Sequence, residues 1–379
     1  MNNTTSPALC EDGIVADGTN ITNCSQLDVY YADYAETLNV ERIVGIVVPT
    51  LFSLIFTVGL VGNVLVIIVV SCTPQMRNTT NVLIISLAIS DLSFILVCVP
   101  FTATDYALPI WPFGNVWCKI VQYMINVCAY ASVYTLVLMS LDRYLAVVHA
   151  VASMSIRTTK NSWIAVGILW FVILLINTPN LFINEWKEYP YHGETRSTCT
   201  HNFVDNYHVR IFFSCFTVLA YFVPLTLISV LYVRMLDRLW HGMAGGRMSR
   251  ESLQSKKRVT RMVVVVVVIF ALCWLPIQII FVMTKIFDVG HSKTLLAFQI
   301  VGQCLAYTNS CVNPILYAFL SDNFRKGFKK VLCCGRQNMG RLRRGYTTDF
   351  DRTDTAGAIS ALTTVRNGKN EKFVNDDVV

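Results

Sequence analysis

Charged side chains are scarce in this chain of 379 residues, since Asp, Glu, Lys and Arg together make up only 15% of it. Soluble domains carry about 25%. Hydrophobic residues reach 54%, and the mean hydropathy is +0.50. This composition excludes a disordered chain. It also excludes a nucleic-acid-binding protein despite the net charge of +7, because the basic residues are unevenly placed along the chain. It indicates an integral membrane protein.

Signatures of catalysis are also missing. The sequence has no phosphate-binding loop and no cluster of metal ligands, and the few acids inside its apolar runs do not form a catalytic pair. We therefore expect no enzyme activity. The 13 cysteines do not indicate a redox protein, because many lie in apolar runs, where a thiol behaves as a small hydrophobe.

Long stretches without charge are what the sequence does contain. A helix needs about 20 apolar residues to cross a bilayer, and a barrel would show short alternating segments instead. We therefore predict an all-α membrane protein with a bundle of seven transmembrane helices. The stretches are 43–76, 78–104 (interrupted only by Asp91), 120–141, 161–184, 211–233, 262–284 and 294–321.

The basic residues predict the orientation. Of the 31 Lys and Arg residues, 24 follow the first, third, fifth and seventh stretches. The positive-inside rule then places the N-terminus outside and the C-terminus in the cytoplasm. The first 42 residues have no apolar core of a signal peptide, so we expect the first span to act as the insertion signal. Glycosylation sequons on the predicted outer side start at Asn2, Asn3, Asn20 and Asn23.

Polar residues inside the spans indicate function, because they are unfavourable in lipid. Asp91 lies in the middle of the second span and Asn63 in the first. Three short motifs occur in order on separate spans: Asp-Arg-Tyr at 142–144, Cys-Trp-Leu-Pro at 273–276 and Asn-Pro-Ile-Leu-Tyr at 313–317. Each motif is weak evidence alone, but the set is specific.

This set resembles the rhodopsin-like G-protein-coupled receptors, over residues 43 to 334. The resemblance implies a receptor that binds its ligand outside and activates a heterotrimeric G protein inside. Arg143 would be held by Asp142 at rest, and the two tyrosines Tyr232 and Tyr317 would close on it in the active state. The implied coupling and activation residues are Val133, Asp142, Arg143, Tyr144, Pro224, Tyr232, Phe270, Trp274, Pro276, Asn313, Pro314 and Tyr317.

The resemblance also implies an allosteric sodium pocket, and no other cofactor or metal. A buried carboxylate needs a cation or several hydrogen-bond donors. The implied pocket consists of Asn63, Asp91, Ser132, Asn309 and Asn313. A disulfide between Cys118 and Cys199 is implied as well, whereas the spacing of Cys10 and Cys24 leaves open whether they pair.

We divide the chain into an extracellular glycosylated segment (1–42), the transmembrane domain (43–320), an amphipathic helix on the membrane surface (321–334) and a disordered cytoplasmic tail (335–379). Phe324, Phe328 and Leu332 recur at helical spacing opposite a basic face, which fits binding to anionic membrane lipids. Cys333 and Cys334 are candidate palmitoylation sites. The family implies that receptor kinases and arrestin act on the tail. Whether the last residues, 377–379, bind a PDZ-type domain stays open.

Two further absences narrow the ligand. The last span has no lysine, and Tyr307 stands where opsins carry it, so the chain is not a light receptor. Amine receptors have an aspartate seven residues after the cysteine of span three, where this chain has Ile125. A protonated amine would lack its counter-ion, which disfavours amine ligands and also opioid-like and somatostatin-like receptors.

Neutral amides and aromatic rings occupy the outer thirds of the spans instead. Such groups bind peptide backbone without demanding a charge, and an amidated peptide terminus would suit them. We expect two or three of the eight candidates to pack between helices. The candidates are Gln122, Tyr123, Asn126, Gln278, Phe281, Phe298, Gln299 and Gln303.

Local segments resemble the allatostatin-A receptors of arthropods, which are invertebrate relatives of galanin receptors. They are WPFG (111–114), WCKIVQY (117–123), ASVYTLVLMS (131–140) and CWLPIQ (273–278). Gln278 replaces the histidine of galanin receptors. The group implies short peptides ending in Phe-Gly-Leu-amide and Gi/o proteins. Alternatives are a galanin-, kisspeptin- or somatostatin-like peptide, a seven-helix transporter that uses Asp91, and a non-signalling decoy receptor.

The chain departs from the family at two cytoplasmic positions. Ala150 stands where relatives have a proline in the loop that meets the G protein, and alanine favours continued helix there. Lys256 replaces an acid that pairs with the span-three arginine in rhodopsin. We therefore expect a weaker resting lock, which depends on Asp142 and Thr260.

Overall fold

The computed structural model describes residues 14–16, 19–21, 24–76, 78–191, 194–202, 205–244, 250–290, 292–321 and 324–331. Within this part of the chain, seven helical segments are long and apolar enough to cross a membrane, as predicted. The chain divides into two units, Met1–Lys329 and Lys330–Val379, and the spans all belong to the first. The predicted fold class is confirmed.

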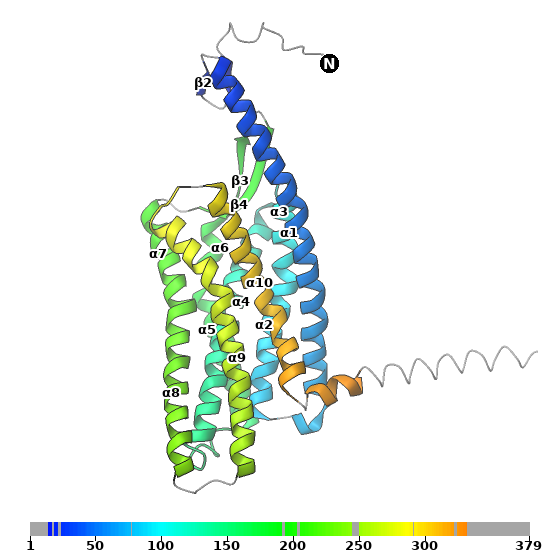
Figure 1. The fold of residues 1–379 in the computed structure, drawn as a ribbon, viewed down its shortest axis with the longest axis vertical. Coiled ribbons are helices and arrows are strands. Elements are labelled where there is room, and N and C mark those ends of the chain that lie inside the picture. Colours follow the sequence, from blue (N-terminus) through cyan, green and yellow to red (C-terminus); the bar gives the residue numbers. More distant parts are fainter. Residues whose placement is uncertain are drawn as a thin grey trace, which may run out of the picture. The chain divides into compact units, whose positions relative to one another are not determined.

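Several spans combine two elements (Figure 1). The first, third and seventh are the single helices α1 (Cys24–Cys72), α4 (Gly114–Val148) and α10 (Lys293–Leu320). The others are α2 (Thr79–Val97) with α3 (Val99–Ala107), α5 (Thr159–Ile176) with α6 (Asn180–Ile183), α7 (Asn206–Thr217) with α8 (Val223–Ala244), and α9 (Arg250–Phe281) with η4 (Val282–Ile286). A 3₁₀ turn, η2 (Pro74–Met76), follows α1, and a short C-terminal helix covers 324–331.

Proline explains why some helices are interrupted. The π-helical turn η3 (Val218–Phe222) joins α7 to α8 directly before Pro224, which has no N–H to donate to the preceding turn. The hydroxyl of Tyr134 donates to the Leu219 carbonyl at 2.9 Å, so α4 supplies a donor within the π-turn. A second π-turn, η4, extends α9 to the end of the sixth span.

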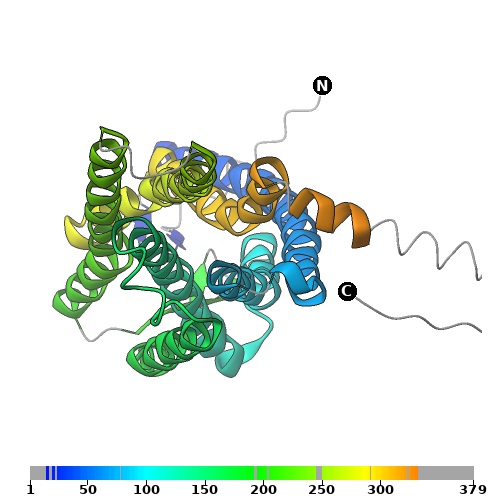
Figure 2. The same cartoon turned by 90° about the horizontal axis from the view of Figure 1, so that it is seen from below.

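Helix α4 packs against α2, α5, α8 and α9, as the end-on view in Figure 2 shows. Glycines permit close approach elsewhere in the bundle. A Cβ on Gly62 of α1 would lie 2.9 Å from Pro314 of α10, and one on Gly302 of α10 would lie 3.0 Å from the backbone nitrogen of Ile277. The approach at Gly62 brings α1 against α10 beside two buried asparagines, Asn63 and Asn313.

A β-hairpin covers one end of the bundle. Its strands β3 (Asn184–Tyr191) and β4 (Glu194–His201) pair antiparallel, from Asn184 opposite His201 to Tyr191 opposite Glu194. The predicted disulfide between Cys118 and Cys199 is present and joins β4 to α4. A second, shorter hairpin, β1 (Ile14–Ala16) with β2 (Thr19–Ile21), precedes α1.

Helix α1 runs alongside the β3–β4 hairpin (Figure 1). Arg196 of β4 forms a bidentate ion pair with Glu41 of α1, at 2.9 and 3.2 Å. These hydrogen bonds raise the pKa of Arg196 above its usual value. Lys293, at the start of α10, pairs with Glu36 at 2.8 Å. Helix α1 is therefore tied both to the hairpin and to the seventh span.

The expectation of continued helix at Ala150 is wrong, because α4 ends at Val148 and turns follow. His149 has a non-helical backbone (φ −115°, ψ 44°). Ser153 closes the end of the helix, since its hydroxyl donates to the Leu145 carbonyl at 3.0 Å and its N–H to the His149 carbonyl at 2.9 Å. These local bonds outweigh the small intrinsic helix preference of alanine.

Candidate functional site

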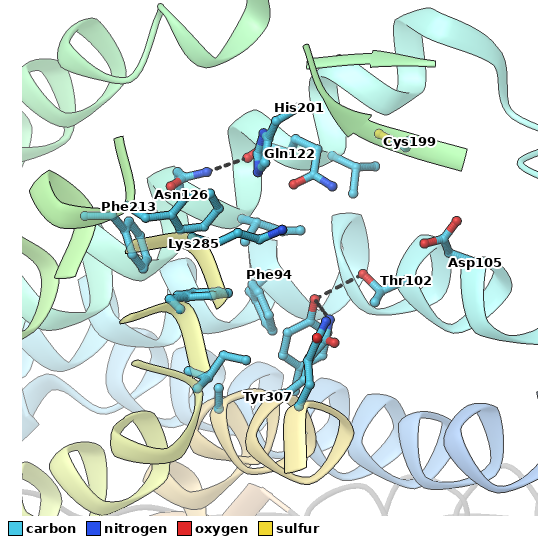
Figure 3. A pocket seen from close by; sticks show the side chains of 18 of the residues that line it. Phe94, Thr102, Asp105, Gln122, Asn126, Cys199, His201, Phe213, Lys285 and Tyr307 are labelled. Atoms are coloured by element: carbon cyan, nitrogen blue, oxygen red, sulfur yellow. Dashed lines mark hydrogen bonds between the residues drawn. The ribbon is translucent and has the colours of Figure 1, made fainter. Parts of the chain in front are cut away.

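A cavity of about 300 Å³ opens beneath the β3–β4 hairpin. Residues from five of the seven spans and from β4 line it, and Cys199 of the disulfide lies at its edge (Figure 3). Aromatic rings form much of the wall, including Phe94, Trp111 and Phe213. A size of a few hundred Å³ with convergent polar groups is typical of a ligand site.

Five of the eight predicted ligand residues line this cavity, namely Gln122, Asn126, Phe281, Gln299 and Gln303. The other three lie elsewhere. Gln278 is buried between helices, where its carbonyl oxygen accepts a hydrogen bond from Thr217 at 2.9 Å. The hydroxyl of Tyr123 donates to the Leu174 carbonyl of α5 at 2.9 Å, and Phe298 is 62% exposed on the outside of the bundle.

The amides of the cavity differ in how much they are already engaged. Tyr106 donates to the Gln303 carbonyl oxygen at 2.6 Å, and the Gln303 amide nitrogen donates to the hydroxyl of Tyr307 at 3.3 Å. Thr102 and Tyr307 are hydrogen-bonded at 3.1 Å. Gln303 therefore holds α10 against α3. Gln122 and Gln299 have no side-chain hydrogen bond to any residue that the structure describes, so a ligand can use theirs.

The cavity also contains titratable residues that sequence reasoning missed: Asp105, His201 and Lys285. The ammonium of Lys285 lies 5.9 Å from the ring centre of Phe213, within reach of a cation–π interaction. Burial, together with the charge of Lys285, lowers the pKa of His201 from 6.5 to about 4, so His201 is neutral at physiological pH.

The predicted switch residues begin at the floor of the cavity. Trp274 lines the cavity and stacks on Phe270, with ring centres 5.8 Å apart. Phe270 and Val133 are 1% and 0% exposed, so they are packed within the bundle. Pro224 follows the η3 turn and Pro276 lies inside α9. A ligand that displaces Trp274 would therefore press on a closely packed layer.

The five predicted sodium-pocket residues are all buried, with at most 5% exposure. Asn313 donates to the Asp91 carboxylate at 2.8 Å, and Asn63 donates to the Ser310 carbonyl at 2.9 Å. The Asn63 carbonyl oxygen and the Ser132 hydroxyl are buried without a hydrogen-bond partner among the described residues. Orphaned buried oxygens are unusual. Together with the Asp91 carboxylate, these oxygens fit a small hard cation.

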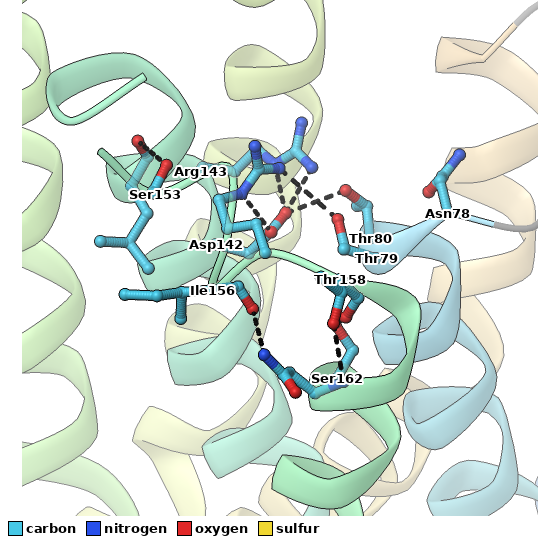
Figure 4. A network of polar contacts seen from close by, with 12 residues as sticks. Asn78, Thr79, Thr80, Asp142, Arg143, Ser153, Ile156, Thr158 and Ser162 are labelled. Carbon is cyan, nitrogen blue, oxygen red and sulfur yellow. Dashed lines mark hydrogen bonds and ion pairs between the residues drawn. The ribbon is translucent and has the colours of Figure 1, made fainter. Parts of the chain in front are cut away.

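At the opposite end of the bundle, Asp142 joins three elements (Figure 4). One carboxylate oxygen forms the ion pair with Arg143 and accepts a hydrogen bond from Thr80 of α2 at 2.9 Å. The other oxygen accepts from the Nε of Arg157 at 2.8 Å. Arg157, in the loop before α5, is a further residue that the sequence did not indicate.

The tyrosines predicted to close on Arg143 form no hydrogen bond with it in this conformation. The buried hydroxyls of Tyr232 and Tyr317 have no hydrogen-bond partner among the described residues. The ring of Tyr317 stacks on Phe324 of the C-terminal helix, at 5.2 Å between centres. Tyr144 points to His149, with its hydroxyl 3.4 Å from the ring nitrogen. Arg143 is thus paired with Asp142, the arrangement expected at rest. Pro314, after Asn313, lies inside α10.

Several predicted sites lie outside the described residues. They include three of the four glycosylation sequons, the candidate palmitoylation sites and Cys10 of the second candidate disulfide, and only the backbone of Cys24 is described. The backbone of Asn20 belongs to β2, but its side chain and those of Lys256 and Thr260 are outside the description too. The residues concerned are Asn2, Asn3, Asn23, Cys10, Cys333 and Cys334.

Comparisons with known proteins agree with these features. Residues 62–317 match the 7 transmembrane receptor family (rhodopsin family). The chain is 51% identical to an allatostatin-A receptor of Bombyx mori, over 85% of this chain and 88% of that protein. It is 38% identical to the galanin-like G-protein coupled receptor npr-9 of Caenorhabditis elegans, over 91% and 88%. Galanin receptor type 1 of Rattus norvegicus is also 38% identical, over 78% and 84%.

Proposed function

Because this chain belongs to the rhodopsin family of seven-transmembrane receptors, within its allatostatin-A and galanin group of neuropeptide receptors, we propose that its ligand is a short amidated peptide of the allatostatin-A type. The peptide ends in Phe-Gly-Leu-amide and binds in the cavity beneath the β3–β4 hairpin. The family is non-enzymatic, and the output is activation of a heterotrimeric G protein, here of the Gi/o type.

The observation that carries the proposal is the chemistry of the cavity. Gln122 and Gln299 present unengaged amides among aromatic walls, and amides both donate to and accept from peptide backbone. Phe281 and Phe213 offer apolar surface for aromatic and leucine side chains, with ring centres 5.1 Å apart. The 51% identity to a protein named allatostatin-A receptor supports the same class of ligand.

Signal transmission follows from what lies below the cavity. A bound peptide acts on Trp274 and, through it, on Phe270. The active state then separates Arg143 from Asp142 and exposes it to the G protein. The agonist shifts the equilibrium only by its differential affinity for the two states, and the G protein raises agonist affinity by the same factor. Sodium at Asp91 favours the resting state, and the buried Asn63 and Ser132 oxygens, which have no partner among the described residues, support a cation there.

The receptor spans the plasma membrane with its N-terminus and the β3–β4 hairpin outside and its tail in the cytoplasm. The asymmetry of Lys and Arg supports this orientation. The outer segment carries glycans, the 324–331 helix binds membrane lipids, and the cysteines that follow it take palmitate. Receptor kinases and arrestin act on the tail.

A response panel tests the ligand and the output together. Cells expressing the receptor are given a peptide ending in Phe-Gly-Leu-amide, its free acid, and galanin-like and somatostatin-like peptides, with inhibition of cAMP formation as the readout. We expect the amidated peptide to be the most potent, and its response to disappear when Gi/o proteins are blocked. A response to a galanin-like peptide instead would retain the receptor and refute the ligand. A response that appears only in cells co-expressing a promiscuous G protein, with no inhibition of cAMP formation, would refute the Gi/o assignment.

A further inference from the structure

The cavity contains two charged side chains of opposite sign, Asp105 from α3 and Lys285 from η4. Neither has an ion-pair partner among the described residues. Figure 3 shows Lys285 reaching toward the middle of the cavity and Asp105 on the other flank, beyond Thr102. The rest of the wall is neutral, including His201 with its lowered pKa. These two charges therefore dominate the field that a ligand meets.

The two hydroxyl groups next to Asp105 on α3 are engaged with α10. Thr102, Asp105 and Tyr106 lie on one face of α3, at positions i, i+3 and i+4. The hydroxyl of Tyr106 already donates to Gln303, and the amide of Gln303 already donates to Tyr307. The carboxylate of Asp105 accepts no hydrogen bond from any residue that the structure describes. A ligand group rich in N–H donors would complete this end of the cavity.

The two charges have opposite effects on the terminus of a peptide. A primary amide is neutral and has two N–H donors, whereas a free carboxylate is negative and only accepts. Beside Asp105 an amide gains a charge-assisted hydrogen bond, and a free acid meets a like charge. Beside Lys285 the order reverses, because the free acid gains an ion pair. Only the Asp105 end can therefore favour the amidated form.

We propose that Asp105 selects the amidated terminus of the ligand: the terminal carboxamide donates to its carboxylate, and the peptide runs from there toward Lys285, whose ammonium binds a carbonyl oxygen. The inference rests on the proposed function, since only a preference for amidated peptides requires an acidic group at the terminus. Trp111 and Val121, which line the cavity, offer an apolar wall for the last side chain.

The test compares one peptide ending in Phe-Gly-Leu as its amide and as its free acid. Dose–response curves are measured on the wild-type receptor, Asp105→Asn, Asp105→Ser and Lys285→Gln, with cell-surface receptor number as a check on folding. Glu188→Gln is the matched control, because Glu188 is an exposed carboxylate of β3 that does not line the cavity.

We expect the amide to be about 30-fold or more favoured over the acid in the wild type, because juxtaposed like charges are strongly unfavourable. In both Asp105 variants this ratio falls to within about threefold, chiefly because the acid becomes more potent. Lys285→Gln weakens both forms without lowering the ratio, and Glu188→Gln changes neither. Two Asp105 variants are used so that poor folding of one does not decide the result.

Three outcomes would overturn the inference. An unchanged ratio in responsive Asp105 variants would show that the terminus lies elsewhere. A ratio altered only by Lys285→Gln would place the terminus at that residue. The same peptide acetylated at its amino end serves as a further probe. If acetylation lowers potency on the wild type but not on Asp105→Asn, Asp105 binds the amine instead. Equal potency of amide and acid on the wild type would refute the proposed amidated ligand itself, which distinguishes the two failures.

Discussion

Replacing Asp142 by asparagine should activate the receptor without ligand. Asp142 is 8% exposed and binds Arg143, Arg157 and Thr80 with its two oxygens. Asparagine keeps one acceptor oxygen and loses the charge. A hydrogen bond to a charged group contributes about 1.5–3 kcal/mol, so we take the loss from the resting state as about 2 kcal/mol.

The size of the effect follows from two-state arithmetic. A change of about 2 kcal/mol shifts the equilibrium between resting and active states by about 30-fold. If about 1% of unliganded receptors are active, the fraction in Asp142→Asn rises to about a quarter. Thr80→Val removes one hydrogen bond to this carboxylate, about 1.5 kcal/mol at the low end of that range, and we expect a rise of about tenfold in the active fraction.

The assay is GTP-analogue binding to G protein in membranes without agonist, normalised to receptor number. Thr79→Val is the control, because Thr79 only accepts a long hydrogen bond of 3.5 Å from Arg157. Wild-type basal signalling in an Asp142→Asn receptor that still responds to agonist would refute the reasoning, because the carboxylate would then not restrain Arg143.

Two other predictions concern buried polar groups. The pKa of His201 is lowered to about 4, so the folded receptor resists protonation there and loses stability as the pH falls below about 6.5, by about 2 kcal/mol at pH 5. Thermal unfolding in detergent at pH 7 and pH 5 should show a smaller loss of stability for His201→Gln than for the wild type. An equal loss in the two proteins would contradict the lowered pKa of His201. Ser132→Ala removes a buried hydroxyl that has no hydrogen-bond partner among the described residues. The weakening of agonist affinity by sodium, relative to a larger organic cation, should therefore shrink severalfold, whereas Ser53→Ala on α1, whose hydroxyl bonds to Thr50, should leave it unchanged. Full sodium sensitivity of Ser132→Ala would show that the Ser132 hydroxyl does not bind sodium.

The seven spans could be predicted because lipid excludes charge, so runs without charge mark helices directly. The same rule explains what was missed. The run 78–104 ends immediately before Asp105, and the run 262–284 ends immediately before Lys285. A method that stops at the first charge treats these residues as flanks of the spans. The structure places both inside the cavity, because the helices continue past the charge to Ala107 and Ile286.

Helical phase explains why Phe298 was misplaced. Gln299 and Gln303 are four residues apart and share a face of α10, whereas Phe298 points about 100° away from Gln299. The sequence shows where a span begins but not which face meets the bundle. Arg157 was not predicted for a different reason, because it lies between two spans. It reaches Asp142 only because the loop folds back along α4.

The two π-turns have a consequence for how this receptor can change over time. Each holds about one more residue per turn than an α-helix; η3 lies within the fifth span, with α7 on its outer side, and η4 forms the outer end of the sixth span. Gaining or losing one residue there rotates everything beyond it by about 100° and leaves the cytoplasmic part in register. Insertion or deletion of one residue can thus place other side chains where Phe212, Phe213 and Lys285 now face the ligand, while the surface that meets the G protein stays unchanged.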